Sequence, residues 1–176
     1  MKDLYEVLID KLSKHEIPVT IIAIGRSALP FYGLSDEYTR DLDFEFMTDD
    51  EHLFDIIKET LGEIGVPANF GESIDRWSVV PMPAGYRDRA KTALEQEKVR
   101  LCVLDPADYV ISKLRRGTSD DQSDAKRVIE KFGLTRGNLE ARFAMIRPVR
   151  DTEMFLFIKS FNSFVESALS PEKEYD

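Results

Sequence analysis

The sequence predicts an α/β protein, with a small mixed β-sheet core, flanking helices and a helical C-terminal part packed on that core. Residues 19–24 are an apolar, β-branched run of strand length. Residues 41–46 alternate acidic and apolar side chains, as a strand with one buried face does. From residue 105 onward the apolar residues recur at helical spacing. We therefore expect a core over residues 1–104 and a helical part over residues 105–176, joined in one compact unit.

The composition is that of an ordinary globular protein, with 176 residues, 43% hydrophobic and 32% charged. The net charge of −9 argues against a broad nucleic-acid footprint, because such a footprint needs a basic face. The single cysteine, Cys102, allows no internal disulfide, so a reducing cytoplasm is the expected location. No apolar segment has the length that a membrane span requires, so no membrane association is expected.

Further elements follow from local patterns. Strands are expected over residues 19–24, 41–46, 77–82 and 99–104. Helices are expected over residues 2–14 and 28–32, and from a Thr48–Glu51 capping box to Leu61. In the C-terminal part, helices are expected from Pro106 to a break at Gly117, over residues 122–132, after a Thr135 cap, and over residues 154–169. Residues 33–40 are expected to form a polar turn, and residues 86–96 a polar helix or loop.

Three carboxylates share one face of the strand expected over residues 41–46. Asp41, Asp43 and Glu45 follow one another at intervals of about 6.6 Å along such a strand. Carboxylates with this spacing can flank a divalent cation such as Mg²⁺ or Mn²⁺, or a pair of such cations. The alternative is the solvated face of an edge strand, where acidic residues are common. A solvated face usually mixes charges of both signs, and this one does not.

A possible phosphate site follows the strand expected over residues 19–24. Gly25 would let the backbone approach a ligand closely, and Ser27 would cap a short helix that begins there. The free N–H groups and the dipole at a helix N-terminus favour phosphate. The Gly-x-Ser pattern alone is weak, because a serine at this place is more often only a cap. Beside a metal-binding carboxylate pair, however, a phosphate cradle suits transfer of a nucleotidyl group.

These motifs together resemble the nucleotidyltransferase superfamily with the polymerase-beta-like fold. The likeness rests on Ile-Gly-Arg-Ser-Ala-Leu at residues 24–29 and on Thr-Arg-Asp-Leu-Asp-Phe at residues 39–44. It continues through residues 103–108 and Lys113-Leu114 to Asp121 and Asp124. The sequence is most similar to small bacterial members of the superfamily, some of unknown function and some of toxin–antitoxin type.

The resemblance implies a binding site for a nucleoside triphosphate and Mg²⁺ or Mn²⁺. Asp41 and Asp43 would be the catalytic, metal-holding pair, with Glu45 beside them. Active members carry a third carboxylate on a later strand, and the candidates here are Asp75 and Glu45. The residues expected to bind the nucleotide are Gly25, Arg26, Ser27 and Lys113.

Arg26 stands where the family usually has glycine or serine. Its guanidinium group would either bind phosphate through two N–H groups or obstruct the close approach of the backbone to the ligand. Lys113 is either a triphosphate ligand or a solvated lysine. Asp121 and Asp124 lie three residues apart on a helix, where they bind Arg or Lys, border the cleft, or lie on the surface. Of these three, we expect the Asp121 side chain to lie on the protein surface.

The expected function is transfer of a nucleotidyl group to an acceptor that is RNA, protein or a small molecule. The alternative is a catalytically inactive binding module, such as the partner protein of a toxin–antitoxin pair. The aromatic stripe of residues 154–169 is most simply core packing, and the alternative is a surface for a protein partner or a homo-oligomer.

Overall fold

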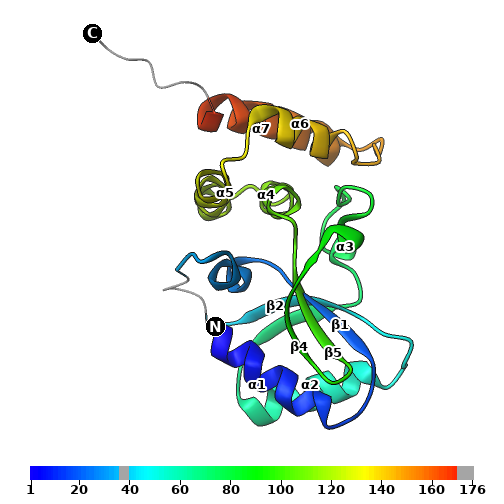
Figure 1. The fold of residues 1–176 in the computed structure, drawn as a ribbon. Helices are drawn as coiled ribbons and strands as arrows, with labels where there is room; N and C mark the ends of the chain where they lie inside the picture. The colour runs from blue at the N-terminus through cyan, green and yellow to red at the C-terminus, as the bar shows by residue number, and fades with distance from the viewer. Residues whose placement is uncertain (36–39, 170–176) are drawn as a thin grey trace. The chain divides into compact units, whose positions relative to one another are not determined.

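The computed structural model describes residues 1–35 and 40–169. Thr39 of the second motif lies outside the described residues, as do residues 36–39 of the turn expected over residues 33–40. The chain forms two compact units, shown in Figure 1. The first comprises Met1–Ile74 and Gly85–Asp105, and the second comprises Asp75–Ala84 and Pro106–Asp176. Residues 75–84, which precede the C-terminal helices in the sequence, belong to the second unit.

The first unit is built on a five-stranded mixed sheet with the order β3-β2-β1-β5-β4, so the predicted α/β fold class is confirmed. The strands are β1 (Val19–Ala23), β2 (Leu42–Met47), β3 (Ala68–Gly71), β4 (Lys91–Gln96) and β5 (Val99–Val103). The central strand β1 pairs antiparallel with β2 and parallel with β5. A strand that is covered on both sides reads as a continuous apolar run, which is the pattern that predicted β1.

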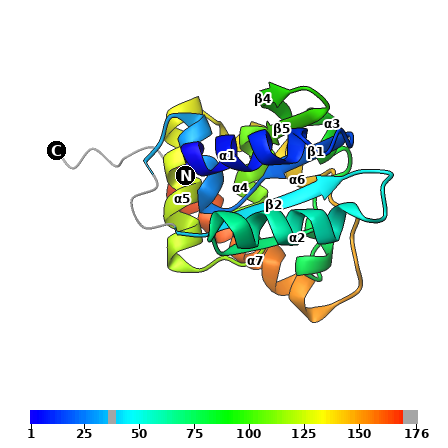
Figure 2. The ribbon, with the colours of Figure 1, turned by 90° about the horizontal axis from the view of Figure 1, so that it is seen from below.

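Helices cover one face of this sheet. α1 (Lys2–Ser13) and α2 (Leu53–Ile64) lie side by side against it in Figures 1 and 2. The side chains of Leu42, Phe44 and Phe46 are buried on β2, and the ring of Phe46 lies 6.3 Å from the ring of Phe54 on α2. The short helix α3 (Tyr86–Arg89) supplies Tyr86, which meets Glu45. Because side chains alternate along a strand, Glu45 and α3 lie on the opposite face.

The second unit is helical, as predicted for the C-terminal part. Its helices are α4 (Pro106–Leu114), α5 (Ser119–Phe132), α6 (Arg136–Phe143) and α7 (Thr152–Leu169). Capping boxes at Thr118 and Thr135 begin α5 and α6, so the predicted Thr135 cap is confirmed. In the described part of the chain, no helix combines the length and the apolar character that crossing a membrane needs.

The aromatic stripe of α7 is largely core packing. Phe157 and Phe161 are buried, and the rings of Phe143 and Phe161 stack with their centroids 4.3 Å apart. The same helix leaves Phe155 and Leu156 more than half exposed. The expected partner surface on this helix therefore remains a prediction, now restricted to its exposed side chains.

Several local predictions were wrong. Residues 77–82 form no strand, because the 3-10 helix η2 (Ile74–Trp77) and an irregular segment occupy this region. The strands β3 and β4 were missed because neither is strongly apolar: the residues of β4 are all exposed or half-buried. The predicted Thr48–Glu51 capping box is absent, since Thr48 Oγ1 accepts from the backbone of Asp50 and α2 begins only at Leu53.

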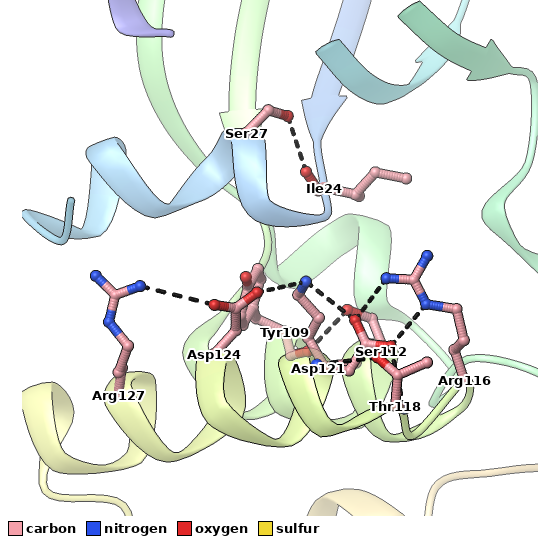
Figure 3. Close-up of polar contacts among 10 residues, drawn as sticks. Ile24, Ser27, Tyr109, Ser112, Arg116, Thr118, Asp121, Asp124 and Arg127 are labelled. Carbon is pink, nitrogen blue, oxygen red and sulfur yellow. Dashed lines mark hydrogen bonds and ion pairs between the residues drawn. The ribbon is translucent and has the colours of Figure 1, made fainter. Parts of the chain in front are cut away.

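A buried ionic cluster joins α4 to α5 in the second unit. Lys113 Nζ donates to Asp121 Oδ1 at 3.2 Å and to Asp124 Oδ2 at 2.8 Å, and the three side chains are at most 6% exposed. Arg116 adds a two-pronged contact with Asp121, with its Nε donating to Oδ2 at 2.6 Å (Figure 3). The expectation that Asp121 lies on the surface is wrong, whereas the alternative that these acids bind Lys and Arg is correct.

The cluster makes the folding stability depend on pH through Asp121. Burial alone would raise the pKa of this carboxyl, but hydrogen bonds from Arg116 and Thr118 and the charge of Lys113 lower the pKa to about 2. The usual value is 3.8. A carboxyl whose pKa is lower in the folded protein adds stability above its unfolded-state pKa, and loses it as the pH falls through the folded-state value. The contribution at neutral pH is about 2 kcal/mol.

We predict that Asp121→Asn lowers the free energy of unfolding near pH 7 by about 2 kcal/mol or more, because Lys113 and Arg116 lose a charged partner. The difference from wild type should narrow between pH 4 and pH 2, where the wild-type carboxyl becomes protonated. Urea unfolding at a series of pH values measures both effects. The matched control is Glu130→Gln, which removes an exposed carboxylate from the same helix. A constant difference across the whole pH range would contradict the assigned role of Asp121.

Candidate functional site

The first unit brings two of the predicted metal-binding carboxylates together at the start of β2. Asp41 directly precedes the strand and Asp43 is its second residue. One nitrogen, Nδ2 of Asn69, donates to Asp43 Oδ1 at 2.9 Å and to Asp41 Oδ2 at 3.2 Å. Asn69 reaches both because β3 runs parallel to β2 with Asn69 opposite Asp43. The two carboxylates therefore share one side of the sheet and one hydrogen-bond donor.

Gly25 lies directly against this pair. Its φ is +59°, a left-handed conformation that other L residues rarely adopt. A Cβ atom at this position would lie 2.4 Å from Asp43 Oδ2, which is closer than van der Waals contact permits. Gly25 is thus required both by the backbone turn after β1 and by the neighbouring carboxylate. The next element is the 3-10 helix η1 (Arg26–Tyr32), so the helix predicted over residues 28–32 begins two residues earlier.

Ser27 does not cap this helix, because Gly25 occupies the cap position and Ser27 is its second residue. The Ser27 side chain is fully buried. Its Oγ donates to the carbonyl of Ile24 at 3.0 Å (Figure 3) and accepts from the backbone N–H of Asp43 at 3.1 Å. Tyr5 Oη on α1 lies 2.9 Å from the same oxygen. Arg26 is half-buried at the first position of η1.

Glu45 lies in a different environment from Asp41 and Asp43. Its side chain is fully buried, and its Oε2 accepts from the backbone N–H of Ile74 and from Tyr86 Oη, both at 2.6 Å. Its Oε1 accepts from Arg87 Nε at 2.7 Å. Burial and the contact with Glu45 raise the pKa of Tyr86, which therefore remains a donor. Glu45 follows Asp43 by two residues on the same face of β2, but internal donors surround its carboxylate, so we leave it out of the proposed metal site.

Two further predicted residues belong to the second unit. Asp75 lies within η2, where its Oδ1 accepts from the backbone N–H of Met82 at 2.6 Å and lies 3.8 Å from an Arg115 nitrogen. The sequence predicted a strand over residues 77–82, shortly after Asp75, but no strand follows Asp75 there. Lys113 is neither solvated nor at the protein surface, since Asp121 and Asp124 hold its ammonium group within the buried cluster.

The carboxylate pair fits a divalent cation that is completed by a ligand. Among residues 1–35 and 40–169, no group of three or more His, Cys, Asp and Glu side chains is placed to hold a metal ion. Mg²⁺ is commonly held by only one or two carboxylates, together with water and substrate phosphates. Both carboxylates contact the same nitrogen atom of Asn69, so both can reach one central atom. Asp41 and Asp43 are therefore the residues of this region that could hold a substrate-bound Mg²⁺.

Sequence reasoning missed two residues of this site, Asn69 and Tyr5. Asn69 is part of a four-residue strand that lacks a strong pattern, and only the Pro67 before it and the Gly71 at its end indicate a short element. Tyr5 was hidden within the apolar face of the first helix, where an aromatic residue ordinarily signals packing.

One of three comparisons with known proteins identified a family. The model of one family, described as a nucleotidyltransferase of unknown function (DUF6036), matches residues 2–139. Neither the search of curated proteins nor the search of solved structures found a match. The matched region contains the Gly25 turn, the carboxylate pair and Asn69, and extends through α4 and α5 into α6. The chain therefore belongs to this family of nucleotidyltransferases of unknown function.

Proposed function

We propose that the protein binds a nucleoside triphosphate with Mg²⁺ or Mn²⁺ at Asp41 and Asp43 and transfers a nucleotidyl group to an acceptor. The acceptor is RNA, a protein or a small molecule. The observation that carries the proposal is the convergence of Asp41, Asp43 and Asn69 beside Gly25. Family membership supports the reaction class.

The proposed roles follow from the positions of the residues. Asp41 and Asp43 hold the cation, which supplies charge neutralisation and Lewis-acid polarisation of the phosphoryl oxygens. Gly25 leaves room for the Asp43 carboxylate, and Arg26 at the start of η1 is the proposed cationic contact to the phosphates. The attacking group of the acceptor forms a bond to the α-phosphorus and displaces pyrophosphate, and a carboxylate of the pair accepts the proton of that group. Lys113 has no role in this proposal, because Asp121 and Asp124 already bind its ammonium group.

A second candidate function is metal-dependent nucleotide binding without transfer, as in an inactive module that partners another protein of a toxin–antitoxin pair. The observation that favours it is the residue beside the pair: β3 presents the amide of Asn69 to Asp43, and not a third carboxylate. Incubation with each labelled nucleoside triphosphate, Mg²⁺ and pools of RNA, protein and small-molecule acceptors separates the two functions. A labelled product supports transfer, whereas retained nucleotide without any product supports the binding module.

We predict that Mg²⁺ and Mn²⁺ raise the melting temperature of the wild-type protein and leave that of Asp43→Asn unchanged. A ligand that binds only the folded state stabilises it by about 1.4 kcal/mol at ten times its dissociation constant. Differential scanning fluorimetry with a titration of each ion measures the shift. Asp55→Asn is the matched control, since it removes an exposed aspartate from α2 in the same unit. Equal shifts in wild type and Asp43→Asn would place the ion elsewhere.

We predict that Asn69→Asp has opposite effects in the presence and absence of metal. Without metal, a third carboxylate replaces the donor that Asp41 and Asp43 share, so the repulsion lowers the melting temperature in EDTA. With Mn²⁺ the same carboxylate adds a ligand, so the affinity for Mn²⁺ should increase. Calorimetric titration and thermal unfolding measure the two effects. If Asn69→Asp bound Mn²⁺ more weakly than wild type, the side chain of residue 69 would not face the ion.

A further inference from the structure

We propose that the hydroxyl groups of Tyr5 and Ser27 are positioning groups that fix the backbone of Asp43, and that Ser27 does not itself bind phosphate. The inference rests on the proposed function, because it concerns the residue that we assign to the cation. The same contacts exist in the protein without any ligand, where α1, η1 and the residue after β1 hold one residue of β2.

The backbone of Asp43 is held at both of its polar groups. Its carbonyl oxygen accepts from the backbone N–H of Ile24 at 2.9 Å and from Tyr5 Oη at 2.8 Å. Its N–H donates to Ser27 Oγ at 3.1 Å. The partners come from α1, from η1 and from the residue that follows β1. The strand start that carries the two carboxylates is thereby tied to the Gly25 turn.

Ser27 has no proton left to donate to a phosphate oxygen, because its single hydroxyl proton is donated to the Ile24 carbonyl. A hydroxyl group has one proton to donate and two acceptor positions. Ser27 Oγ lies within hydrogen-bond distance of the Ile24 carbonyl, the Asp43 N–H and Tyr5 Oη, and the side chain has no exposed surface. A phosphate oxygen would have to displace one of these internal bonds and open a buried site. The sequence pattern Gly-x-Ser therefore serves, in this chain, to build the loop.

The hydroxyl of Tyr5 has a role beyond packing. Its ring lies edge-on to Phe31 and to Phe44, at centroid distances of 5.6 and 6.4 Å, and phenylalanine would preserve both contacts. The hydroxyl donates to the Asp43 carbonyl at 2.8 Å, a bond that phenylalanine cannot form. Burying a hydroxyl carries a free-energy cost unless it is hydrogen-bonded, and here its partners are Asp43 and Ser27.

Fixing the backbone of Asp43 also fixes its carboxylate. That carboxylate lies between Gly25, where a Cβ would overlap it, and the amide of Asn69. Ligands must be held to within about 0.5 Å of their productive positions for a site to work. Hydrogen bonds that orient metal ligands typically change metal affinity by about 10–100-fold when they are removed. Removing the Tyr5 hydroxyl should therefore weaken metal binding without touching the metal.

The test compares Tyr5→Phe with Tyr32→Phe. Tyr32 is a matched control, because its buried hydroxyl also donates at 2.8 Å to a backbone carbonyl in the same unit, that of Leu104. The expected result is that Tyr5→Phe weakens Mn²⁺ binding by about tenfold in calorimetric titration. Tyr32→Phe should lower the unfolding stability to a similar extent and bind Mn²⁺ as wild type does. Equal Mn²⁺ affinity in Tyr5→Phe and wild type would overturn the proposal.

A second measurement tests the same contacts without metal. Amide hydrogen exchange should show strong protection of the Asp43 N–H in wild type, and Ser27→Ala should accelerate its exchange relative to the Ile22 amide of β1. Fast exchange of the Asp43 amide in wild type would overturn the proposal even if Mn²⁺ binds. A protected amide in a wild-type protein without Mn²⁺ affinity would instead leave the positioning contacts standing and reject the proposed function.

A third measurement tests whether Ser27 contacts the phosphates of a bound nucleotide. Ser27→Ala should bind a nucleoside triphosphate in EDTA with unchanged affinity, measured by titration of a fluorescent triphosphate analogue. A weaker affinity in EDTA would show that Ser27 contacts the phosphates and would overturn that part.

Discussion

Two like charges close together on one strand are the constraint around which the first unit is arranged. Asp41 and Asp43 repel each other, and this repulsion opposes folding unless a donor or a cation lies between them. In the structure one amide nitrogen, from Asn69, donates to both carboxylates. Asn69 reaches both carboxylates because β3 pairs with β2 in the register that sets Asn69 opposite Asp43. The position of the edge strand β3 and the contacts of the two carboxylates are therefore linked.

The acidic residues of the chain are used in two different ways. Glu45, Asp121 and Asp124 are buried and accept hydrogen bonds from Arg, Lys, Tyr or backbone donors, so their charges are compensated within the protein. Asp41 and Asp43 are only half-buried and keep part of their surface open to solvent. Only carboxylates of the second kind are available to an external cation, because removing a compensated charge from its partners is costly. Charge alone therefore does not single out the candidate residues, whereas incomplete burial together with clustering distinguishes Asp41 and Asp43 from the compensated acids.

The sequence predicted the features that depend on local patterns. The central strand, the acidic strand, the Gly25 turn and the C-terminal helices each carry a periodicity or a cap that acts over a few residues. The features it did not predict depend on pairing between distant segments. β3 became a strand because β2 offers it a partner, and Glu45 became buried because Tyr86 and Arg87 close over it. Likewise, Asp121 looks like a surface residue until α4 brings Lys113 to it.

The division of the chain affects how the protein can be dissected. The chain passes between the two units at residues 74–75, 84–85 and 105–106, so the sheet unit is not a continuous stretch of sequence. Within the second unit, residues 75–84 depend on later segments: the Val80 carbonyl accepts from Arg115, and the Ala84 N–H donates to the Met145 carbonyl. A fragment that ends at residue 105 would keep this segment but lose both partners. An isolated sheet unit therefore has to be made by replacing residues 75–84 with a short linker, and not by truncation.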